Sequence, residues 1–169
     1  MNVVFRFFLT SLCCVFVAAS PARAEVINIS GQQGIWGAWT PLGVTFDAGS
    51  YTVTPVTPTT PGALYTAYNY GSGYGWGTGY GIALSQNDRK YYGAGSYSTA
   101  ELAFAHAVGA SFSLASRQTV YFGVLDSSYG DNSGGVSLNI TAVPEPETYA
   151  MLLAGLGLMG VIARRRKQK

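Results

Sequence analysis

The sequence predicts an all-β fold, a single antiparallel β-sandwich that lies between two export segments. Short runs of β-branched and aromatic residues recur along the middle of the chain, and some of them alternate between apolar and polar positions. Glycine, proline, aspartate and asparagine separate these runs, as turns require. Apolar segments near the two ends predict a signal helix within residues 1–24 and a single transmembrane helix at about residues 149–163. The β-sandwich domain is therefore assigned to residues 25–142.

The N-terminal segment has the features of a secretory signal peptide. Arg6 precedes an apolar stretch over residues 7–19, and Ala22–Ala24 forms an A-x-A cleavage site. Both cysteines, Cys13 and Cys14, lie in this segment, so the processed chain would have no disulfide and no thiolate chemistry. A retained N-terminal helix is the alternative interpretation.

Each predicted strand is short and is followed by turn residues. The turn at residues 47–50 joins two runs, and Tyr51 and Val53 then share one face of the second run. Near the end of the domain, Val136, Leu138 and Ile140 alternate with polar residues. About 118 residues are enough for one core, and short antiparallel strands at this spacing favour a sandwich. The predicted strands are residues 26–29, 44–46, 51–56, 111–114, 119–125 and 135–140.

One segment fits two kinds of secondary structure. The alanines of residues 100–108 favour a helix, but Leu102, Phe104, His106 and Val108 alternate as they would in a strand. We favour a strand there.

Two stretches predict irregular structure. Residues 57–62 are rich in threonine and proline and predict a rigid loop, whereas residues 65–80 interleave aromatic residues with glycine. Glycine allows the backbone to approach a ligand, and aromatic faces suit the apolar faces of pyranose rings. The aromatic rings could instead pack on the edge of the sandwich, and both interpretations stay open. The candidate ligand-binding residues are Tyr68, Tyr70, Tyr74 and Trp76.

The charge of the middle of the chain differs from that of the whole. The whole chain has a formal net charge of +2, but residues 25–142 contain six acidic and three basic residues, a net charge of −3. This balance excludes the basic footprint of a nucleic-acid-binding protein. The few charges and the many Gly, Tyr, Ser and Thr residues are typical of sugar-binding and matrix proteins.

The polar turn between the last two predicted strands is a candidate metal site. Asp126 ends one strand, and Asp131 and Asn132 precede the next. A hairpin would bring these side chains together, and calcium takes six to eight oxygen ligands from carboxylates, amides and carbonyls. The EF-hand spacing is absent. A turn in which Asp and Asn bond to their own backbone explains the same residues, so spacing alone leaves the two readings equal.

The C-terminal segment has three parts in a fixed order. Pro144, Glu145 and Pro146 form a short box, an uncharged apolar run extends over residues 149–163, and Arg164, Arg165 and Arg166 begin a basic cluster. Fifteen helical residues cover only about 22 Å, less than a bilayer core of roughly 30 Å. The apolar run is therefore marginal as a permanent anchor.

This arrangement, over residues 143–169, resembles the PEP-CTERM sorting signal of Gram-negative bacteria. The resemblance implies retention in the inner membrane, recognition by an exosortase and cleavage near the Pro-Glu-Pro box. It also implies a cell that makes exopolysaccharide, and hence a role at the cell surface or in biofilm. A tail anchor that is never processed is the alternative, but it does not account for the box.

The Asp126 turn and the strand after it are similar to the end of the bacterial galactophilic calcium lectins, which are jelly-roll sandwiches. Residues 39–51 also resemble the N-terminal strand pair of that family. The resemblance implies that the side chains of Asp126, Asp131 and Asn132 bind calcium together with the Ser128 carbonyl. The bound metal would then help to hold sugar hydroxyls.

The chain departs from the lectin pattern in three ways. The loop after Asp126 is two residues shorter, and Asp131 replaces the first Asn of the pair. A further carbonyl ligand from a distant loop has no assigned position, and Tyr70 is a candidate for it. The sugar-contacting His and Gln of the family have no clear counterpart, so galactose is not predicted.

Catalysis is not expected. The only histidine, His106, lies among apolar residues, which favours a satisfied, partly buried imidazole over a catalytic triad. The nucleophile-elbow, zinc-protease and phosphate-loop motifs are absent. Asp126 and Asp131 could in principle form a glycosidase pair, but carboxylates on one short turn converge on a cation more readily than they flank a bond.

The sequence thus predicts an exported, exosortase-sorted, non-catalytic protein that binds extracellular polysaccharide, with calcium as a candidate cofactor. The alternative is a structural surface or matrix protein in which any calcium only holds a loop in place. The expected partners are exosortase, the inner membrane before processing, and polysaccharide, but not nucleic acid.

Overall fold

The structure is a computed structural model. The predicted signal peptide lies outside the described residues except for Ala24, as does Glu145 of the Pro-Glu-Pro box. The structure describes residues 24–37, 39–71, 73–93, 95–144 and 146–166.

The first sheet is built around one long strand, β10 (Ser133–Val143). Strands β1 (Ala24–Ser30) and β3 (Gly49–Val56) both pair antiparallel with residues 137–141 of β10, so they lie on its opposite edges. Beyond β3 lies β8 (Ala110–Leu114). Near its start β10 pairs with the two-residue strand β4 (Tyr68–Asn69), which pairs with β5 (Trp76–Gly77).

The second sheet has the strand order β2-β9-β6-β7 and is also antiparallel. Its strands are β2 (Leu42–Phe46), β9 (Gln118–Val124), β6 (Tyr80–Ser85) and β7 (Asp88–Tyr92). The β6–β7 hairpin was not predicted, because Gly81 and Ala83 interrupt the apolar alternation of β6 with small residues.

A single hydrophobic core draws on both sheets. Leu138 and Ile140 of β10 and Phe122 of β9 are almost fully buried, because alternate side chains of a strand point to opposite faces. The core combines strands far apart in the chain: Ile27, Ile29, Phe46, Val53, Tyr68, Tyr80, Ile82, Leu114, Val120, Phe122, Val124, Tyr129, Val136, Leu138 and Ile140. The all-β, antiparallel, sandwich-like prediction is confirmed.

Residues 100–105 form a helix, so the prediction of a strand there is wrong. Helix α1 (Ala100–Ala105) begins at Thr99, whose side chain accepts a hydrogen bond from the backbone N–H of Leu102. Such a cap supplies a partner to an N–H that the first turn leaves free. Only Ala103 of this helix is buried, and Leu102 is exposed, so the alternation of larger residues does not correspond to a buried strand face.

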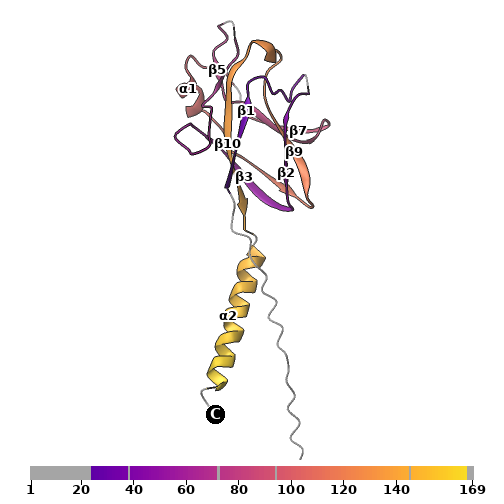
Figure 1. Cartoon of the computed structure of the whole chain (residues 1–169), viewed down its shortest axis with the longest axis vertical. Helices are drawn as coiled ribbons and strands as arrows, with labels where there is room; N and C mark the ends of the chain where they lie inside the picture. The colour runs from indigo at the N-terminus through magenta and orange to yellow at the C-terminus, as the bar shows by residue number, and fades with distance from the viewer. Residues whose placement is uncertain (1–23, 38, 72, 94, 145, 167–169) are drawn as a thin grey trace, which may run out of the picture.

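The C-terminal segment forms the helix α2 (Pro146–Arg166), which Figure 1 shows extending away from the sheets after β10. Within the described part of the chain, no helix combines the length and the apolar character needed to cross a membrane. The predicted transmembrane helix at residues 149–163 is therefore not confirmed. The physical reason is the shortness of its uncharged run, about 22 Å of helix.

A polar network fastens the loop of residues 57–67 to the first sheet. The Ser137 hydroxyl on β10 is completely buried and donates to Oδ1 of Asn28 on β1 (2.6 Å). The Ser137 oxygen accepts from the backbone N–H groups of Leu64 (3.1 Å) and Tyr65 (2.9 Å). Asn28 Nδ2 in turn donates to the Gly62 carbonyl (2.9 Å). Two side chains thus bind the loop backbone at three points.

Ser137→Ala should lower the free energy of unfolding by about 1–3 kcal/mol, because it leaves the part-buried Tyr65 N–H without its acceptor and removes a donor from Asn28 Oδ1, while the Leu64 N–H keeps Asn28 Oδ1 as a partner. The measurement is chemical denaturation of the full chain in a detergent. Ser113→Ala is the matched control, since that hydroxyl is exposed and bonds to Ser50 at the surface. Equal losses in the two variants would show that the buried network does not hold the loop.

Candidate functional site

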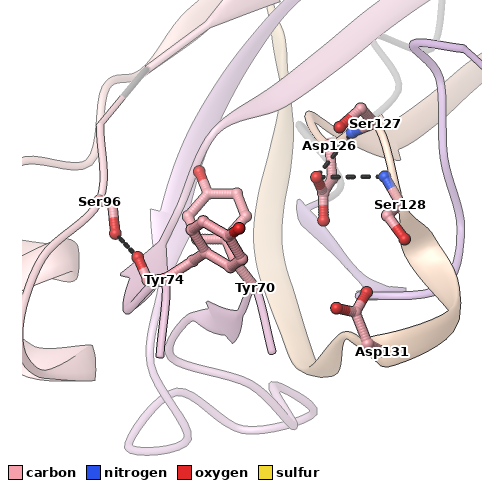
Figure 2. A pocket seen from close by; sticks show the side chains of 7 residues that line it. All are labelled: Tyr70, Tyr74, Ser96, Asp126, Ser127, Ser128 and Asp131. Carbon is pink, nitrogen blue, oxygen red and sulfur yellow. Dashed lines mark hydrogen bonds between the residues drawn. The ribbon is translucent and has the colours of Figure 1, made fainter. Parts of the chain in front are cut away.

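A pocket of about 590 Å³ lies where the turn between β9 and β10 meets the chain after β4. In Figure 2 the carboxylates of Asp126 and Asp131 lie to one side of the Tyr70 and Tyr74 rings, and Ser96 lies to the other. Three predicted metal ligands and two predicted sugar-contacting tyrosines therefore share one pocket. Its lining residues are Tyr70, Tyr74, Ser96, Asp126, Ser127, Ser128 and Asp131.

Asp126 has one carboxylate oxygen bound to its own turn and one oxygen without a partner. Its Oδ1 accepts from the backbone N–H groups of Ser127 (2.6 Å) and Ser128 (3.3 Å). This is the Asx-type turn that was the alternative to a metal. Its Oδ2, however, is buried and has no hydrogen-bond partner among the described residues.

Asn132 shows the same pattern more strongly. Its side chain is only 5% exposed, and its Nδ2 donates to the Gly31 carbonyl at 2.9 Å. Because the Gly31 carbonyl can only accept a hydrogen bond, the amide atom that faces it is the nitrogen, and the other atom is the oxygen Oδ1. That oxygen is also buried without a partner among the described residues. A third such oxygen belongs to Asn139, inside β10.

The register of β4 against β10 brings the distant loop to the turn. Asn69 pairs with Ser133, so continuing the antiparallel register places Tyr70 opposite Asn132 and Gly71 opposite Asp131. A Cβ added at Gly71 would lie 2.6 Å from Oδ2 of Asp131, which confirms that the carboxylate reaches this backbone. Gly71 has φ +76°, and its N–H is held by Oδ1 of Asn69 (2.8 Å). The Tyr70–Gly71 backbone therefore reaches the predicted ligand Asp131, as the Gly31 backbone reaches Asn132.

The four aromatic candidates divide into two groups. Tyr70 and Tyr74 line the pocket, and Tyr74 is 72% exposed. Trp76 is not among the lining residues and belongs to β5, where it pairs with Tyr97. Tyr68 is completely buried, so its prediction as a ligand-contacting residue is wrong.

Tyr68 instead lies behind the pocket, where its hydroxyl contacts residues of the pocket wall and of the adjoining strand end. Its hydroxyl donates its one proton to the Leu125 carbonyl (2.9 Å), and the Tyr70 hydroxyl lies 3.2 Å from the same oxygen. Burial raises the pKa of Tyr68 far above its ordinary value, and the neighbouring Tyr70 and Asp126 raise it further. Burial also raises the pKa of Tyr129, so this side chain is uncharged. Its hydroxyl oxygen accepts a hydrogen bond from the Trp36 N–H (3.0 Å). Tyr68 and Tyr129, whose pKa values are raised, thus stay neutral beside the carboxylate of Asp126.

The chemistry available in the pocket is that of oxygen donors. Among the described residues, no group of three or more His, Cys, Asp or Glu side chains could hold a metal ion. A cation here would need amide and carbonyl oxygens besides the two carboxylates, which hard cations accept. His106 lies elsewhere, exposed at the end of α1, where it stacks on Tyr97 and is not partly buried as predicted.

Ser96 and Ser127 line the pocket but were not predicted. The Ser96 hydroxyl donates to the Tyr74 carbonyl, which ties residues far apart in sequence. Ser96 lies in a Gly-Ser-Tyr stretch that matches no binding motif, so the sequence did not indicate that it would line a pocket. Ser127 could have been predicted, because it follows Asp126 in the same polar turn.

Comparison with known proteins identifies the C-terminal segment. Residues 142–167 match the family model of the PEP-CTERM protein-sorting motif. No curated protein matches the chain. No solved structure matches it either. The resemblance to galactophilic calcium lectins therefore has no support from these comparisons.

The motif indicates an exported protein that exosortase sorts to the cell surface or the extracellular space. The structure places Pro144 just beyond the end of β10 and puts Pro146 at the start of α2. Arg164 and Arg165 are exposed at the far end of that helix. Pro146 and the basic residues Arg164 and Arg165 thus lie near opposite ends of one helix.

Replacing Arg164, Arg165 and Arg166 together by Ala should leave an uncleaved, mis-sorted precursor, because the basic cluster is the part of the motif that holds the segment's orientation. Fractionation and immunoblotting of cells that contain exosortase measure this. Arg117→Ala, which removes a cation from an exposed ion pair with Asp47, is the control and should be processed normally. Normal processing of the triple variant would contradict the prediction.

The raised pKa of Tyr68 predicts a loss of stability in alkali. Since the folded chain binds this proton more tightly than the unfolded chain does, the contribution is complete below the ordinary value of 10.0 and is lost as the pH rises above it. The free energy of unfolding of Tyr68→Phe should therefore fall less steeply above about pH 10. Denaturation at a series of pH values measures the slope. The control is Tyr74→Phe at an exposed ring, and equal slopes in the two variants would contradict the assignment.

Proposed function

We propose that the chain is an exported, non-catalytic surface protein whose pocket binds calcium and, with it, hydroxyl groups of extracellular polysaccharide. Export and sorting follow from the C-terminal motif. The binding function rests on the pocket at the start of β10 and on the residues that line it.

The observation that carries the calcium proposal is the pair of buried oxygens without partners, Asp126 Oδ2 and Asn132 Oδ1. Leaving such an acceptor unpaired costs about 1–3 kcal/mol, and more for a charged group. Both belong to residues that the sequence predicted as metal ligands. A cation beside Asp126 would satisfy its Oδ2 and would offset the repulsion between Asp126 and Asp131, while Asn132 belongs to the same turn but is not among the residues that line the pocket. The donor set therefore fits a hard divalent cation.

Four residues would hold the ion: Asp126, Asp131 and Asn132 through side-chain oxygens, and Ser128 through its carbonyl. The register of β4 favours the Tyr70 carbonyl as the ligand from the distant loop. When bound, calcium supplies a site that attracts neutral hydroxyl oxygens. No hydrolytic role is proposed, because both carboxylates lie on one turn.

The sugar part of the proposal rests on the other lining residues. Tyr70 and Tyr74 offer aromatic faces beside the carboxylates, and Ser96 and Ser127 offer hydroxyl groups. A pyranose ring has both apolar faces and hydroxyl edges, so a mixed wall of this kind suits it. A volume of about 590 Å³ accommodates a small sugar unit.

We also infer that the domain is a jelly roll. The order β1-β10-β3-β8 in one sheet and β2-β9-β6-β7 in the other, with the chain crossing between the sheets except at the β6–β7 hairpin and the short strands β4 and β5, is that of two Greek keys. This connectivity leaves the turn between β9 and β10 at one end of the domain, where jelly rolls carry binding loops. The sorting segment would hold the precursor in the inner membrane until exosortase cleaves it.

One observation favours a second function, a structural surface protein in which the ion only stabilises the turn. Asn132 already joins the turn to Gly31 of the loop after β1, so a cation on Asn132 would also fix that loop. In this case calcium raises the melting temperature, but sugars do not bind.

Calcium should bind the full chain and should raise its melting temperature. Asp126→Asn should weaken binding by at least about tenfold, since it removes a charge from the donor set. Asp88→Asn, on the exposed strand β7, is the control of equal charge change and should bind as the original chain does. Isothermal calorimetry in a detergent without sugar groups measures the calcium affinity of the original chain and of the two variants, and a thermal scan measures the melting temperature. Absence of calcium binding, or equal effects of the two variants, would contradict the site.

The two functions separate on a glycan array with and without EDTA. Sugar binding that EDTA abolishes supports the first. Melting that EDTA lowers, without any sugar binding, supports the second. Polysaccharide hydrolysis that Asp126→Asn abolishes would contradict both, because it would show an enzyme.

A further inference from the structure

The outer face of the second sheet presents aromatic rings around one guanidinium group. Tyr121 of β9 pairs with Gly43 and with Ala83, and Ala83 pairs with Arg89 of β7, so these side chains form a row across the sheet. Phe122, the neighbour of Tyr121, points into the core, so the row points outward. The small residues beside Tyr121 leave room above the sheet.

The segment that precedes β2 crosses this face and completes the cluster. Trp39 lies on Tyr121, with 5.4 Å between ring centroids, and the Arg89 guanidinium carbon lies 4.9 Å from the Trp39 centroid. Arg89 Nη1 donates to the Ile35 carbonyl (2.8 Å), and its Nε donates to the Gln86 carbonyl (2.5 Å). The guanidinium is therefore held in one position, although only two of its five N–H groups are used in these bonds.

Two further aromatic residues are open to solvent near Arg89 in the chain: Trp36 follows Ile35, whose carbonyl binds the guanidinium, and Tyr91 is two residues along β7. Trp36 is 56% exposed and Tyr91 is 49% exposed. A Cβ added at Gly81 would contact both Ile35 and Tyr91, so the Trp36 segment and Tyr91 are neighbours on this face. We call Trp36, Trp39, Arg89, Tyr91 and Tyr121 the aromatic platform.

The charge on this face is opposite to that of the domain. Arg89 is the charged side chain in the row of Tyr121 and Ala83, and Asp88 pairs with Ser85 at the end of the β6–β7 hairpin, whereas residues 25–142 together have a net charge of −3. Both pocket carboxylates belong to the β9–β10 turn. A ligand that carries a carboxylate would therefore find its complement on the platform and not in the acidic pocket. Flat exposed rings beside a fixed cation suit a pyranose ring that carries an acid group.

We propose that the aromatic platform binds an anionic polysaccharide made of uronic-acid pyranose units, with sugar faces on Trp36 and Tyr91 and a sugar carboxylate on Arg89. Trp39 and Tyr121 position the guanidinium and are not contacts themselves. The inference rests on the proposed polysaccharide binding, but it uses a different surface and needs no calcium.

The test is calorimetry of the full chain, in a detergent without sugar groups and with EDTA present, against tetramers of galacturonate and of mannuronate and against neutral galactotetraose. At least one acidic tetramer should bind, and the neutral one should bind more weakly. Trp36→Ala and Arg89→Gln should each lower the affinity about three- to tenfold, and Arg89→Lys should recover part of the loss at low salt. Leu64→Ala, which shortens a side chain that is 66% exposed on the loop after β3 and belongs to neither surface, should change nothing.

Two outcomes overturn the inference. One is the absence of binding to either acidic tetramer in EDTA. The other is binding that Trp36→Ala and Arg89→Gln leave unchanged, with circular dichroism showing all variants folded. Binding that requires calcium and is lost in Asp126→Asn would assign the sugar to the pocket, which removes this inference and keeps the proposed function. Binding that Trp36→Ala and Arg89→Gln weaken, and that calcium does not affect, would keep this inference and remove the proposed role of calcium in sugar binding.

Discussion

The pairing of strand β10 with three other strands is the constraint on which the rest of the molecule depends. Its edges carry β1 and β3, and its first residues carry β4, which brings Tyr70 and Gly71 to the turn before it. At its other end the sorting motif begins at residue 142, inside the strand. Eleven extended residues span roughly 35 Å, so the pocket lies at the far end of the domain from the sorting helix. A domain held at its C-terminus would direct the pocket away from the membrane.

The two candidate surfaces use the same few chemical means in different ways. The pocket combines carboxylates with neutral tyrosines, and buried Tyr68 holds the Tyr70 hydroxyl in place. The platform combines exposed rings with a guanidinium that backbone carbonyls hold. A cation would neutralise the first surface, while the second already carries its own positive charge. A polymer with both neutral and acidic units could engage both, which would suit a protein sorted to the outside of the cell.

The sequence predicted those features that depend on local pattern. Alternating residues such as Val136, Leu138 and Ile140 identified β10, because burial of one strand face leaves a period of two. The strand wrongly assigned to residues 100–108 shows the limit of that signal, since a Thr99 cap decided for a helix. Asp126, Asp131 and Asn132 could be found because they share one turn. The contribution of the Tyr70 loop, and the burial of Tyr68, depend on the pairing of β4 with β10, which links residues over sixty positions apart and leaves no local pattern. The platform was missed for the same reason.

Sensitised terbium luminescence tests the central claim, a cation site at the start of β10, most directly. Terbium is a hard cation that takes oxygen ligands as calcium does, and a nearby excited tyrosine transfers energy to it. Tyr70 and Tyr74 line the pocket beside Asp126, so excitation of tyrosine should produce terbium emission that added calcium removes. Emission that is absent, or that calcium does not displace, would contradict the account.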